Sequence, residues 1–213
     1  MFNTRSQKLI ELQKYMNLET GIIDETAFAW ENGLYEKGLR KKILDCQIQK
    51  CGLCEGLNVK RLSEACCGWG DLNAEVFFVG QSLHKAGMLT GLPFIQGSGY
   101  MLDAALRLSG LLRKDVFISN TTHCHPPGNR QSSEGEKENC LPFLREELNI
   151  VEPSLVVGLG VDAKQALESL GVKAFCATHP AKFMYSEPES RYGWILKLSL
   201  QIDKVLRDSK EKP

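Results

Sequence analysis

Side chains capable of chemistry are concentrated near the middle of the chain, where an amide, two thiols and a Pro/Gly-rich loop follow one another. Asn120 offers both a hydrogen-bond donor and an acceptor. Cys124 and Cys140 are candidate metal ligands, and Cys51 and Cys54 form a C-x-x-C pair upstream. Four thiolates suit either a tetrahedral zinc ion or an iron–sulfur cluster. The pattern predicts a four-cysteine metal site beside a binding crevice.

The spacing of the cysteines does not by itself decide between the two kinds of metal centre. Zinc sites often use two tight C-x-x-C pairs, whereas Cys124 and Cys140 are far apart, which favours a cluster and keeps zinc as the alternative. Cys176 falls in an apolar run, and we expect it to be a buried core thiol. Three further thiols stay undecided, and one of them could replace a ligand of the set: Cys46, Cys66 and Cys67.

Composition indicates one globular domain. The chain has 213 residues, of which 43% are hydrophobic, and its formal net charge is zero. That length supports a full core with a short appendage. The N-terminal residues are too polar for a signal peptide, and no apolar run approaches the roughly 20 residues of a membrane span. We therefore expect a cytoplasmic monomer outside membranes, with cysteines that bind metal rather than form disulfides.

Zero net charge neither supports nor excludes nucleic acid as a partner, because local patches of charge decide such binding.

Short apolar runs alternate with helical patterns through most of the chain. Strands are expected at residues 75–80, 116–119, 154–158 and 172–177. Helices are expected at residues 99–112, 133–148, 162–170 and 192–205. Ser133 and Glu136 have the form of a capping box at the start of one of them. The alternation predicts an α/β fold with three layers, α/β/α, around a central, mainly parallel four-stranded sheet.

The beginning of the chain follows a different pattern. Helical spacing at residues 4–17 and 24–50, interrupted by Gly33 and Gly38, predicts a helical N-terminal extension. We assign this extension to residues 1–45 and the α/β domain to residues 46–213. Within the domain, residues 46–70 are expected to form a loop.

Polar residues stand at the ends of three predicted strands. Gln81 and Ser82 follow the first, Asn120 the second and His179 the last. Parallel sheets bind ligands outside the carboxyl ends of their strands. These side chains are therefore expected to meet in one site.

The order of motifs adds a family resemblance. The segments that carry it are Cys51/Cys54, Val79-Gly80, Gly91-Leu92-Pro93-Phe94, Gly97-Ser98-Gly99, residues 120–130, Cys140, Leu159-Gly160 and His179-Pro180. This order, over residues 51–185, resembles that of the iron–sulfur uracil-DNA glycosylases, often called family 4. The block from Asn120 to Cys140 is the most specific part of the match.

The resemblance implies a base-excision fold and a [4Fe-4S] cluster held by the four cysteines Cys51, Cys54, Cys124 and Cys140. It also implies a flipped base that stacks on Phe94 and is read by Asn120, with His179 near the base and the sugar. The segment after His179 would enter the DNA. These roles suit a glycosylase, which must extrude a base and hold it by stacking and hydrogen bonds to its edge.

One part of the chain departs from the family. Relatives carry acids in the loop that precedes Gly-x-Pro-Phe, but residues 81–90 contain no carboxylate. Gly80-Gln81 resembles the start of the family 1 water-activating motif, in which an Asp stands at the position of Ser82. The candidates to replace the missing acid are Ser82, His84 and His179, and the alternative is that DNA phosphates stabilise the sugar cation. Because His84 falls where relatives shape the pocket around the C5 edge of the base, we expect a modified or bulky base as substrate.

Several residues are candidates for contacts with DNA. The backbone N–H groups of Gly97, Ser98 and Gly99 precede a helix and suit a phosphate. Lys182 is followed by apolar residues 183–185, a combination that suits insertion into a duplex. Arg130 would contact a phosphate or brace the cluster loop.

Two functions from different classes follow. The favoured one is a monofunctional DNA glycosylase that hydrolyses the N-glycosidic bond of a flipped uracil or modified base and leaves an abasic site, with no lysine placed for a lyase step. The alternative is a non-catalytic DNA-binding protein that retains the glycosylase fold, because the loop lacks its acid. A third possibility, an α/β domain of unrelated function that is stabilised by zinc, does not explain the block from Asn120 to Cys140.

Overall fold

The computed structural model describes residues 33–210. The chain divides into two compact units, residues 1–40 and 41–213. The described part opens with helix α3 (Gly33–Gln49), which Gly38 does not interrupt, contrary to our expectation from the sequence. The helix predicted at residues 4–17 and most of the proposed extension lie outside the described residues.

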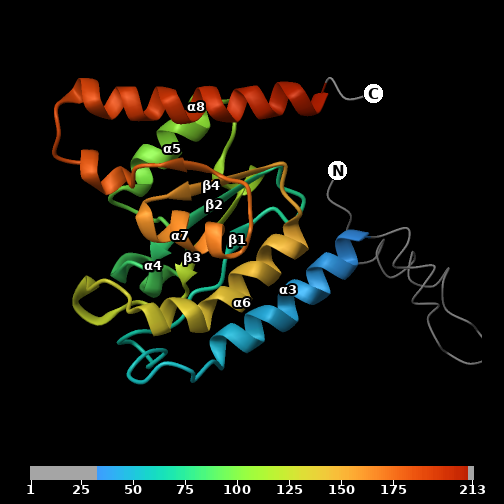
Figure 1. Ribbon diagram of the computed structural model, residues 1–213, viewed down its shortest axis with the longest axis vertical. Helices are drawn as coiled ribbons and strands as arrows, with labels where there is room; N and C mark the ends of the chain where they lie inside the picture. Colours follow the sequence, from blue (N-terminus) through green and yellow to red (C-terminus); the bar gives the residue numbers. More distant parts are fainter. Residues whose placement is uncertain (1–32, 211–213) are drawn as a thin grey trace, which may run out of the picture. The chain divides into compact units, whose positions relative to one another are not determined.

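A five-stranded sheet forms the centre of the larger unit (Figure 1). Its strands are β1 (Trp69–Gly70), β2 (Val76–Ser82), β3 (Phe117–Thr122), β4 (Leu155–Leu159) and β5 (Phe175–Ala177). They lie in the order β1-β3-β2-β4-β5, and the last four are mutually parallel. The predicted α/β class and parallel sheet are confirmed.

The fifth strand corrects the predicted count of four. β1 pairs antiparallel with β3 inside the stretch that was expected to be all loop. Gly70 allows this close approach, because a Cβ there would stand 1.9 Å from the Val116 carbonyl oxygen. The positive φ of Gly70, 142°, also favours glycine. A two-residue strand of this kind has no alternating pattern that sequence reasoning could detect.

Helices cover both faces of the sheet, as Figure 1 shows. They are α5 (Gly99–Leu108), α6 (Glu134–Val151), α7 (Val161–Ser169) and α8 (Pro188–Lys210). The short helix α4 (Lys85–Thr90) follows the end of β2 and packs on Leu83 and Cys66. α5 and α8 share one core cluster with the sheet, and α6 and α7 share the other. The three-layer architecture is therefore confirmed. No helix in residues 33–210 is both long and apolar enough to cross a bilayer.

The capping box at the start of α6 is confirmed. The Ser133 hydroxyl accepts the Glu136 backbone N–H, and the Glu136 carboxylate accepts the Ser133 N–H. This satisfies two backbone donors that a helix start would otherwise leave unpaired. Two other expectations change: α5 ends at Leu108, before Gly110 with its φ of 72°, and the loop predicted after β2 contains α4.

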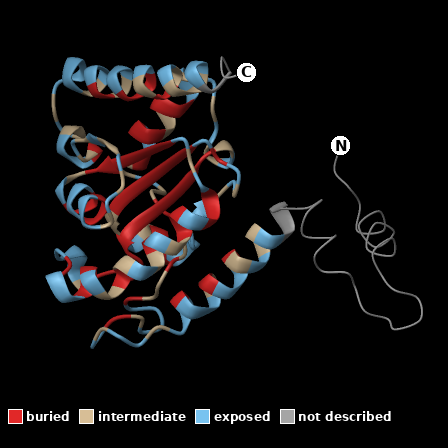
Figure 2. Cartoon of the chain, turned by 45° about the vertical axis from the view of Figure 1, so that its right-hand side comes forward, coloured by how far each residue is buried: buried red, intermediate tan, exposed pale blue. Residues whose placement is uncertain are grey.

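The sheet is the most deeply buried element, which Figure 2 shows as a red centre between paler helices. Alternate residues of β2 point to opposite faces. Phe78 joins the α5/α8 cluster, whereas Phe77 joins the α6/α7 cluster and stacks on Phe117 at 4.9 Å between ring centroids. All six residues of β3 are buried, and this strand extends to Thr122, three residues beyond its predicted end. Asn120 therefore lies within the strand.

Candidate active site and four-cysteine centre

The proposed base-reading and base-stacking residues meet over a glycine. Gly80 of β2 and Asn120 of β3 are directly paired across the two parallel strands. A Cβ on Gly80 would stand 2.6 Å from Asn120 Oδ1 and 2.4 Å from Phe94 Cε2. The amide and the ring thus converge on the same point, which only a residue without a side chain leaves open. Asn120 is 3% exposed, and the hydrogen bonds of the described residues leave its carboxamide unused.

His179 stands beside this pair. Its ring centroid is 5.8 Å from that of Phe94, and it caps the 3-10 turn η3 (Pro180–Phe183) after β5. Its Nδ1 accepts the Ala181 backbone N–H at 3.2 Å, which places the proton of the neutral ring on Nε2. Burial lowers the pKa of His179, so the neutral form is favoured. Gly160 makes room for it, because a Cβ there would stand 3.2 Å from the Cβ of His179.

Three candidates to replace the missing acid lie at the end of β2 and at the start of α4. Gln81 and Ser82 are its last residues and are partly exposed. The Gln81 carbonyl accepts the Thr121 hydroxyl, which locks this strand end to β3. His84 is exposed and caps α4, where its Nδ1 accepts the Ala86 N–H at 3.4 Å. His84 is thus held at the start of a helix rather than in an open loop.

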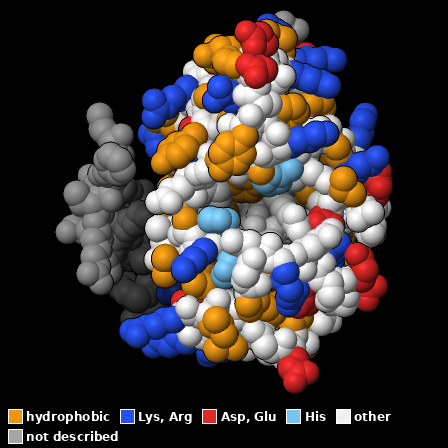
Figure 3. All heavy atoms as spheres, turned by 90° about the vertical axis from the view of Figure 1, so that its left-hand side faces the viewer, with side chains coloured by type: hydrophobic (Ala, Val, Ile, Leu, Met, Phe, Trp, Pro, Cys, Tyr) orange, Lys and Arg blue, Asp and Glu red, His pale blue; other side chains and the backbone are white. Residues whose placement is uncertain are grey.

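A hollow marks the molecular surface on the side where α4 and the turn after β5 lie in Figure 1. On this face, drawn in Figure 3, histidine side chains gather around the hollow, with hydrophobic and Lys or Arg side chains beside it. Lys182 is exposed on η3, and the neighbouring Tyr185 is 96% exposed. These features suit a surface that meets a negatively charged polymer.

Gly99, the first residue of α5, and Arg130, after the Pro-Pro sequence, already have internal partners. The Gly99 N–H donates to the Gln96 carbonyl at 2.9 Å. Gly97 and Ser98 are partly exposed. Arg130 donates to both oxygens of Glu136, at 2.9 and 2.6 Å. This ion pair connects the loop after Cys124 with the start of α6, which is the contact expected if Arg130 braces that loop.

The four predicted ligands surround one cavity although they come from three separate segments. Cys51 and Cys54 lie after α3, and Cys124 lies just beyond β3, opposite Ala65 in an isolated bridge. The fourth thiol belongs to α6. The cavity is lined by Cys51, Cys54, Cys124 and Cys140. The sequence prediction that these four thiols lie together agrees with this geometry.

The thiols around the cavity suit a bound metal cation. Burial, and then the nearby Cys140, raise the pKa of Cys124 to about 12, and burial also raises the pKa of Cys54. Thiolates this close repel one another, and a bound cation is what makes such a set stable. Thr122 also lines the cavity, and its buried Oγ1 has no hydrogen-bond partner among the described residues. An all-thiolate donor set with a spare hydroxyl donor fits a metal centre.

No group of three or more histidine, cysteine or carboxylate side chains within residues 33–210 is arranged to ligate one metal ion. The four thiols stand around the cavity rather than in contact with a single point.

Two asparagines that sequence reasoning missed hold the cysteine segments. Asn58 donates to the carbonyl oxygens of Gln49 and Cys51, each at 2.9 Å, and accepts the Ala65 N–H at 3.0 Å. Asn139 donates to Cys54 Sγ at 3.4 Å. Only the position of Asn139, directly before Cys140, was a usable signal in the sequence.

The other cysteines lie outside this cavity. Cys66 is buried with Leu83 and Met88, and burial raises its pKa to about 12. Burial likewise raises the pKa of Cys67, and Cys46 is exposed. The expectation that Cys176 is a buried core thiol is wrong: the residue is exposed, because β5 forms an edge of the sheet.

A buried carboxylate joins the two sites. Glu147 of α6 is fully buried and accepts the Gly68 N–H at 2.8 Å and the hydroxyl of Ser119. It also pairs with His123 Nε2 at 3.3 Å. Burial alone would lower the pKa of His123, but the Glu147 carboxylate outweighs it and raises that pKa to about 10. The pair is therefore charged, and it ties α6 to the residues on either side of Asn120.

Glu147 also left a signal in the sequence that was missed. It falls on the buried stripe of α6 between Leu144 and Leu148, where a carboxylate needs a partner.

Comparison with known proteins agrees with this geometry. The sequence profile of the Uracil DNA glycosylase superfamily matches residues 67–200. A type-4 uracil-DNA glycosylase from Thermotoga maritima is 33% identical over 130 residues, which cover 61% of this chain and 67% of the relative. One from Pyrobaculum aerophilum is 34% identical over 128 residues, 60% of this chain and 64% of the relative. A type-5 uracil-DNA glycosylase from the same organism is 39% identical over 127 residues, 52% and 56% of the two chains.

The chain thus spans about two thirds or less of the length of these relatives. The matched segment contains the whole parallel sheet, with Gly80 and Asn120 inside β2 and β3 and His179 just beyond β5. It begins after Cys51 and Cys54, which the structure nevertheless places with the other two thiols. The chain belongs to the uracil-DNA glycosylase superfamily, as a type-4-like member whose residues 81–90 contain no carboxylate.

Proposed function

We propose that this protein is a monofunctional DNA glycosylase that hydrolyses the N-glycosidic bond of a flipped-out uracil or modified base. One observation carries the proposal: Asn120 Oδ1 and the Phe94 ring converge on the bare Cα of Gly80, with His179 beside them. A base-excising enzyme needs an edge-reading group, a stacking surface and a group near the leaving base within one pocket.

Each of the three side chains has a distinct task in this proposal. The Asn120 carboxamide donates to one atom of a pyrimidine edge and accepts from the next. The Phe94 ring supplies a face on which the extruded base stacks. Because Asn120 is embedded in a buried strand between two paired strands, its carboxamide is fixed before the substrate arrives.

His179 acts on the leaving group. With Nδ1 occupied by the Ala181 N–H, its Nε2–H is free to donate to a carbonyl oxygen of the departing base anion. A neutral donor suits this step because burial lowers the pKa of His179 and charge develops on the base only as the bond breaks. Water then adds to the sugar carbon and its released proton goes to the departed base anion, so the products are a neutral free base and an abasic site.

The cation that forms on the sugar has no carboxylate beside it in residues 81–90. Ser82 or His84 would orient the attacking water, and the phosphates flanking the flipped nucleotide would stabilise the cation. Since no described lysine joins the residues around Gly80, no Schiff-base step is part of the proposal. His84, held at the start of α4, would border the base, and the substrate class we propose includes bases larger than uracil.

The four cysteines would hold a [4Fe-4S] cluster with a structural task. Four thiolates suit either zinc or an iron–sulfur cluster, and the wide spacing between Cys124 and Cys140, which line the same cavity as Cys51 and Cys54, favours the cluster. Bound there, the cluster would supply a cross-link between the Cys51–Cys54 loop, the Cys124 loop and α6. Asn58, Asn139 and the Arg130–Glu136 pair order these segments around it.

The partner in this proposal is DNA, bound by a monomer through the face with the hollow. Oligonucleotides carrying uracil or modified bases should be incubated with the purified full chain and then treated with alkali, which cleaves the strand at abasic sites. We expect cleavage with at least one base and none with Asn120→Ala. Asn73→Ala, an exposed asparagine before β2, serves as the matched control and should cleave like the wild type.

A non-catalytic DNA-binding protein is the second candidate, favoured by the absence of an acid between Gly80 and Phe94. Tight binding to a modified oligonucleotide without abasic product on any base of the panel would select it over the glycosylase.

A further inference from the structure

The loop that carries Phe94 has an unusual backbone. Phe94 has a φ of 55°, Gln96 one of 65° and Gly97 one of 54°. Side chains with a Cβ rarely adopt this left-handed region, and aromatic residues are among the least suited to it. Such conformations persist where surrounding contacts hold them in place. The position of the Phe94 ring therefore depends on whatever fixes its backbone.

Arg113 provides that contact. Its Nη1 donates to the Pro93 carbonyl at 2.9 Å, and its Nη2 donates to the Phe94 carbonyl. The guanidinium thus holds both carbonyls of the strained turn with one planar group, a geometry that suits arginine and not lysine. Its side chain is only 18% exposed, so solvent weakens these bonds little.

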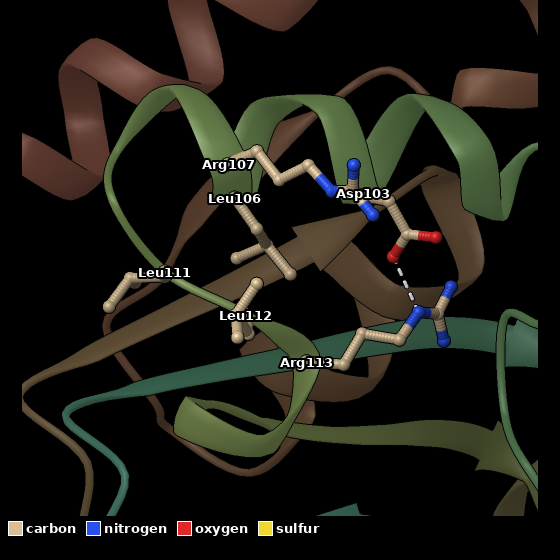
Figure 4. Close-up of a pocket in the computed structure, with 6 residues that line it drawn as sticks. All are labelled: Asp103, Leu106, Arg107, Leu111, Leu112 and Arg113. Carbon is tan, nitrogen blue, oxygen red and sulfur yellow. Dashed lines mark hydrogen bonds and ion pairs between the residues drawn. The ribbon is translucent and has the colours of Figure 1, made fainter.

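Asp103 orients the guanidinium from the other side. Its Oδ1 lies 2.5 Å from Arg113 Nε, and Figure 4 shows this bond between α5 and the segment before β3. The arginine therefore has a carboxylate on one edge and two backbone carbonyls on the other. Arg107 lies in the same pocket without a marked bond to either residue of the pair.

Gly99 makes the arrangement possible. A Cβ at this position would stand 1.7 Å from the Phe94 carbonyl oxygen and 2.9 Å from Arg113 Nη2. No side chain fits there while the carbonyl accepts from the guanidinium. Packing beneath Phe94 thus accounts for this glycine, apart from any contact with phosphate.

The place of Arg113 in the chain connects the two halves of the site. It begins the 3-10 turn η1 (Arg113–Asp115), which leads directly into β3 and so into Asn120. The turn is itself fixed, because the Asp115 carboxylate accepts the Leu112 N–H at 2.8 Å. One short segment therefore anchors the stacking residue at its start and presents the edge-reading residue near its end.

We propose that Arg113, oriented by Asp103, is the positioning residue that sets the Phe94 ring at the correct place beside Asn120. The proposal rests on the proposed function, because the ring matters for base excision only if a base stacks on it. Arg113 itself touches neither base nor sugar. Its effect on excision passes through Phe94.

A double-mutant cycle tests this directly. Arg113→Met removes the guanidinium and keeps an unbranched apolar side chain, and it should lower kcat/KM about 100-fold, the loss typical of a 1 Å misplacement. In a Phe94→Ala background the same change should have no further effect, since residues that act through one another are not additive. Arg113→Lys should recover little of the loss, and Arg107→Met, the matched control, should behave as wild type.

Hydrogen exchange measured by mass spectrometry gives a readout that needs no substrate. The peptide over residues 92–100 should exchange faster in Arg113→Met than in the wild type, and at the wild-type rate in Arg107→Met. This holds even if the wild-type protein excises no base, so failure of the proposed function is distinguishable. If Arg113→Met does not fold, Asp103→Asn takes its place in both measurements. Unchanged exchange in a folded variant, or additive losses in the cycle, would overturn the proposal.

Discussion

Gly80→Ala is the sharpest perturbation of the proposed active site. The added methyl group would stand 2.4 Å from Phe94 Cε2 and 2.6 Å from Asn120 Oδ1. Ordinary contacts of a Cβ begin near 3.4 Å, so the ring or the amide must retreat by about 1 Å, a displacement that costs roughly 100-fold in rate when it separates reacting groups. The backbone cannot yield, because Gly80 is paired with Asn120 in the middle of the sheet.

The effect on stability should be smaller than the effect on activity. Overpacking of a buried site typically costs about 1–3 kcal/mol. For a domain of this size each kcal/mol lowers Tm by about 2–4 °C. The variant should therefore fold, with a modest loss of Tm and a large loss of excision rate.

The assay is single-turnover excision on the best substrate of the panel, with thermal unfolding followed in parallel. Gly135→Ala is the control, because a Cβ at this exposed helical position meets no atom within 4 Å. It should gain up to about 1 kcal/mol in stability and keep wild-type activity. If Gly80→Ala excises as fast as Gly135→Ala, then Phe94 and Asn120 do not form the base pocket, and the argument from their convergence is wrong.

Three further predictions address the metal centre, the buried ion pair and the histidine. Cys124→Ser should abolish the broad absorbance near 400 nm that is expected of a thiolate-ligated cluster. Cys46 lies outside the cavity, so Cys46→Ser should keep this absorbance. A colourless wild-type protein with stoichiometric zinc would contradict the cluster. Glu147→Ala removes the carboxylate that keeps buried His123 charged, so the imidazole becomes neutral, while the Gly68 N–H and the Ser119 hydroxyl lose their acceptor. The change should cost about 2–4 kcal/mol in urea unfolding, and a loss below about 1 kcal/mol would show that the pair is dispensable. Burial lowers the pKa of His179, so single-turnover excision should be constant down to about pH 6.5. In more acidic solution protonation of Nδ1 breaks its bond with the Ala181 N–H, which orients the ring, and the rate should fall; a rate that rises as the pH falls would rule out a neutral donor.

The sequence was sufficient for the parallel sheet and for the residues at its strand ends. Continuous apolar runs without alternation, such as residues 154–158, identify buried parallel strands. The polar residues that follow them are expected at the binding site, because parallel sheets bind ligands at the carboxyl ends of their strands. The four cysteines followed from pairing and family resemblance, and the cavity they line agrees with the grouping.

Contacts between segments remote in sequence were not accessible in the same way. Arg113 lies 19 residues from Phe94, and Glu147 lies 28 residues from Ser119. Their partners are a backbone carbonyl and a hydroxyl, which carry no pattern along the chain. Cys176 was misassigned for a related reason: a three-residue strand looks the same in sequence whether it lies inside a sheet or at its edge, as β5 does.

The pairing of Gly80 with Asn120 also bears on how substrate choice can change in this lineage. In the proposed function Asn120 reads the base from β3 and Gly80 of β2 leaves room for it, and both are interior strands of the sheet, whereas α4 (Lys85–Thr90) is a short helix on the rim beyond the end of β2. Replacing the rim leaves the sheet register untouched. An engineer could therefore graft the corresponding rim of a carboxylate-bearing relative onto this chain as a cassette. In such a graft β2 and β3, with Gly80 and Asn120, would keep their structure, and only the side chains beside the base pocket would change.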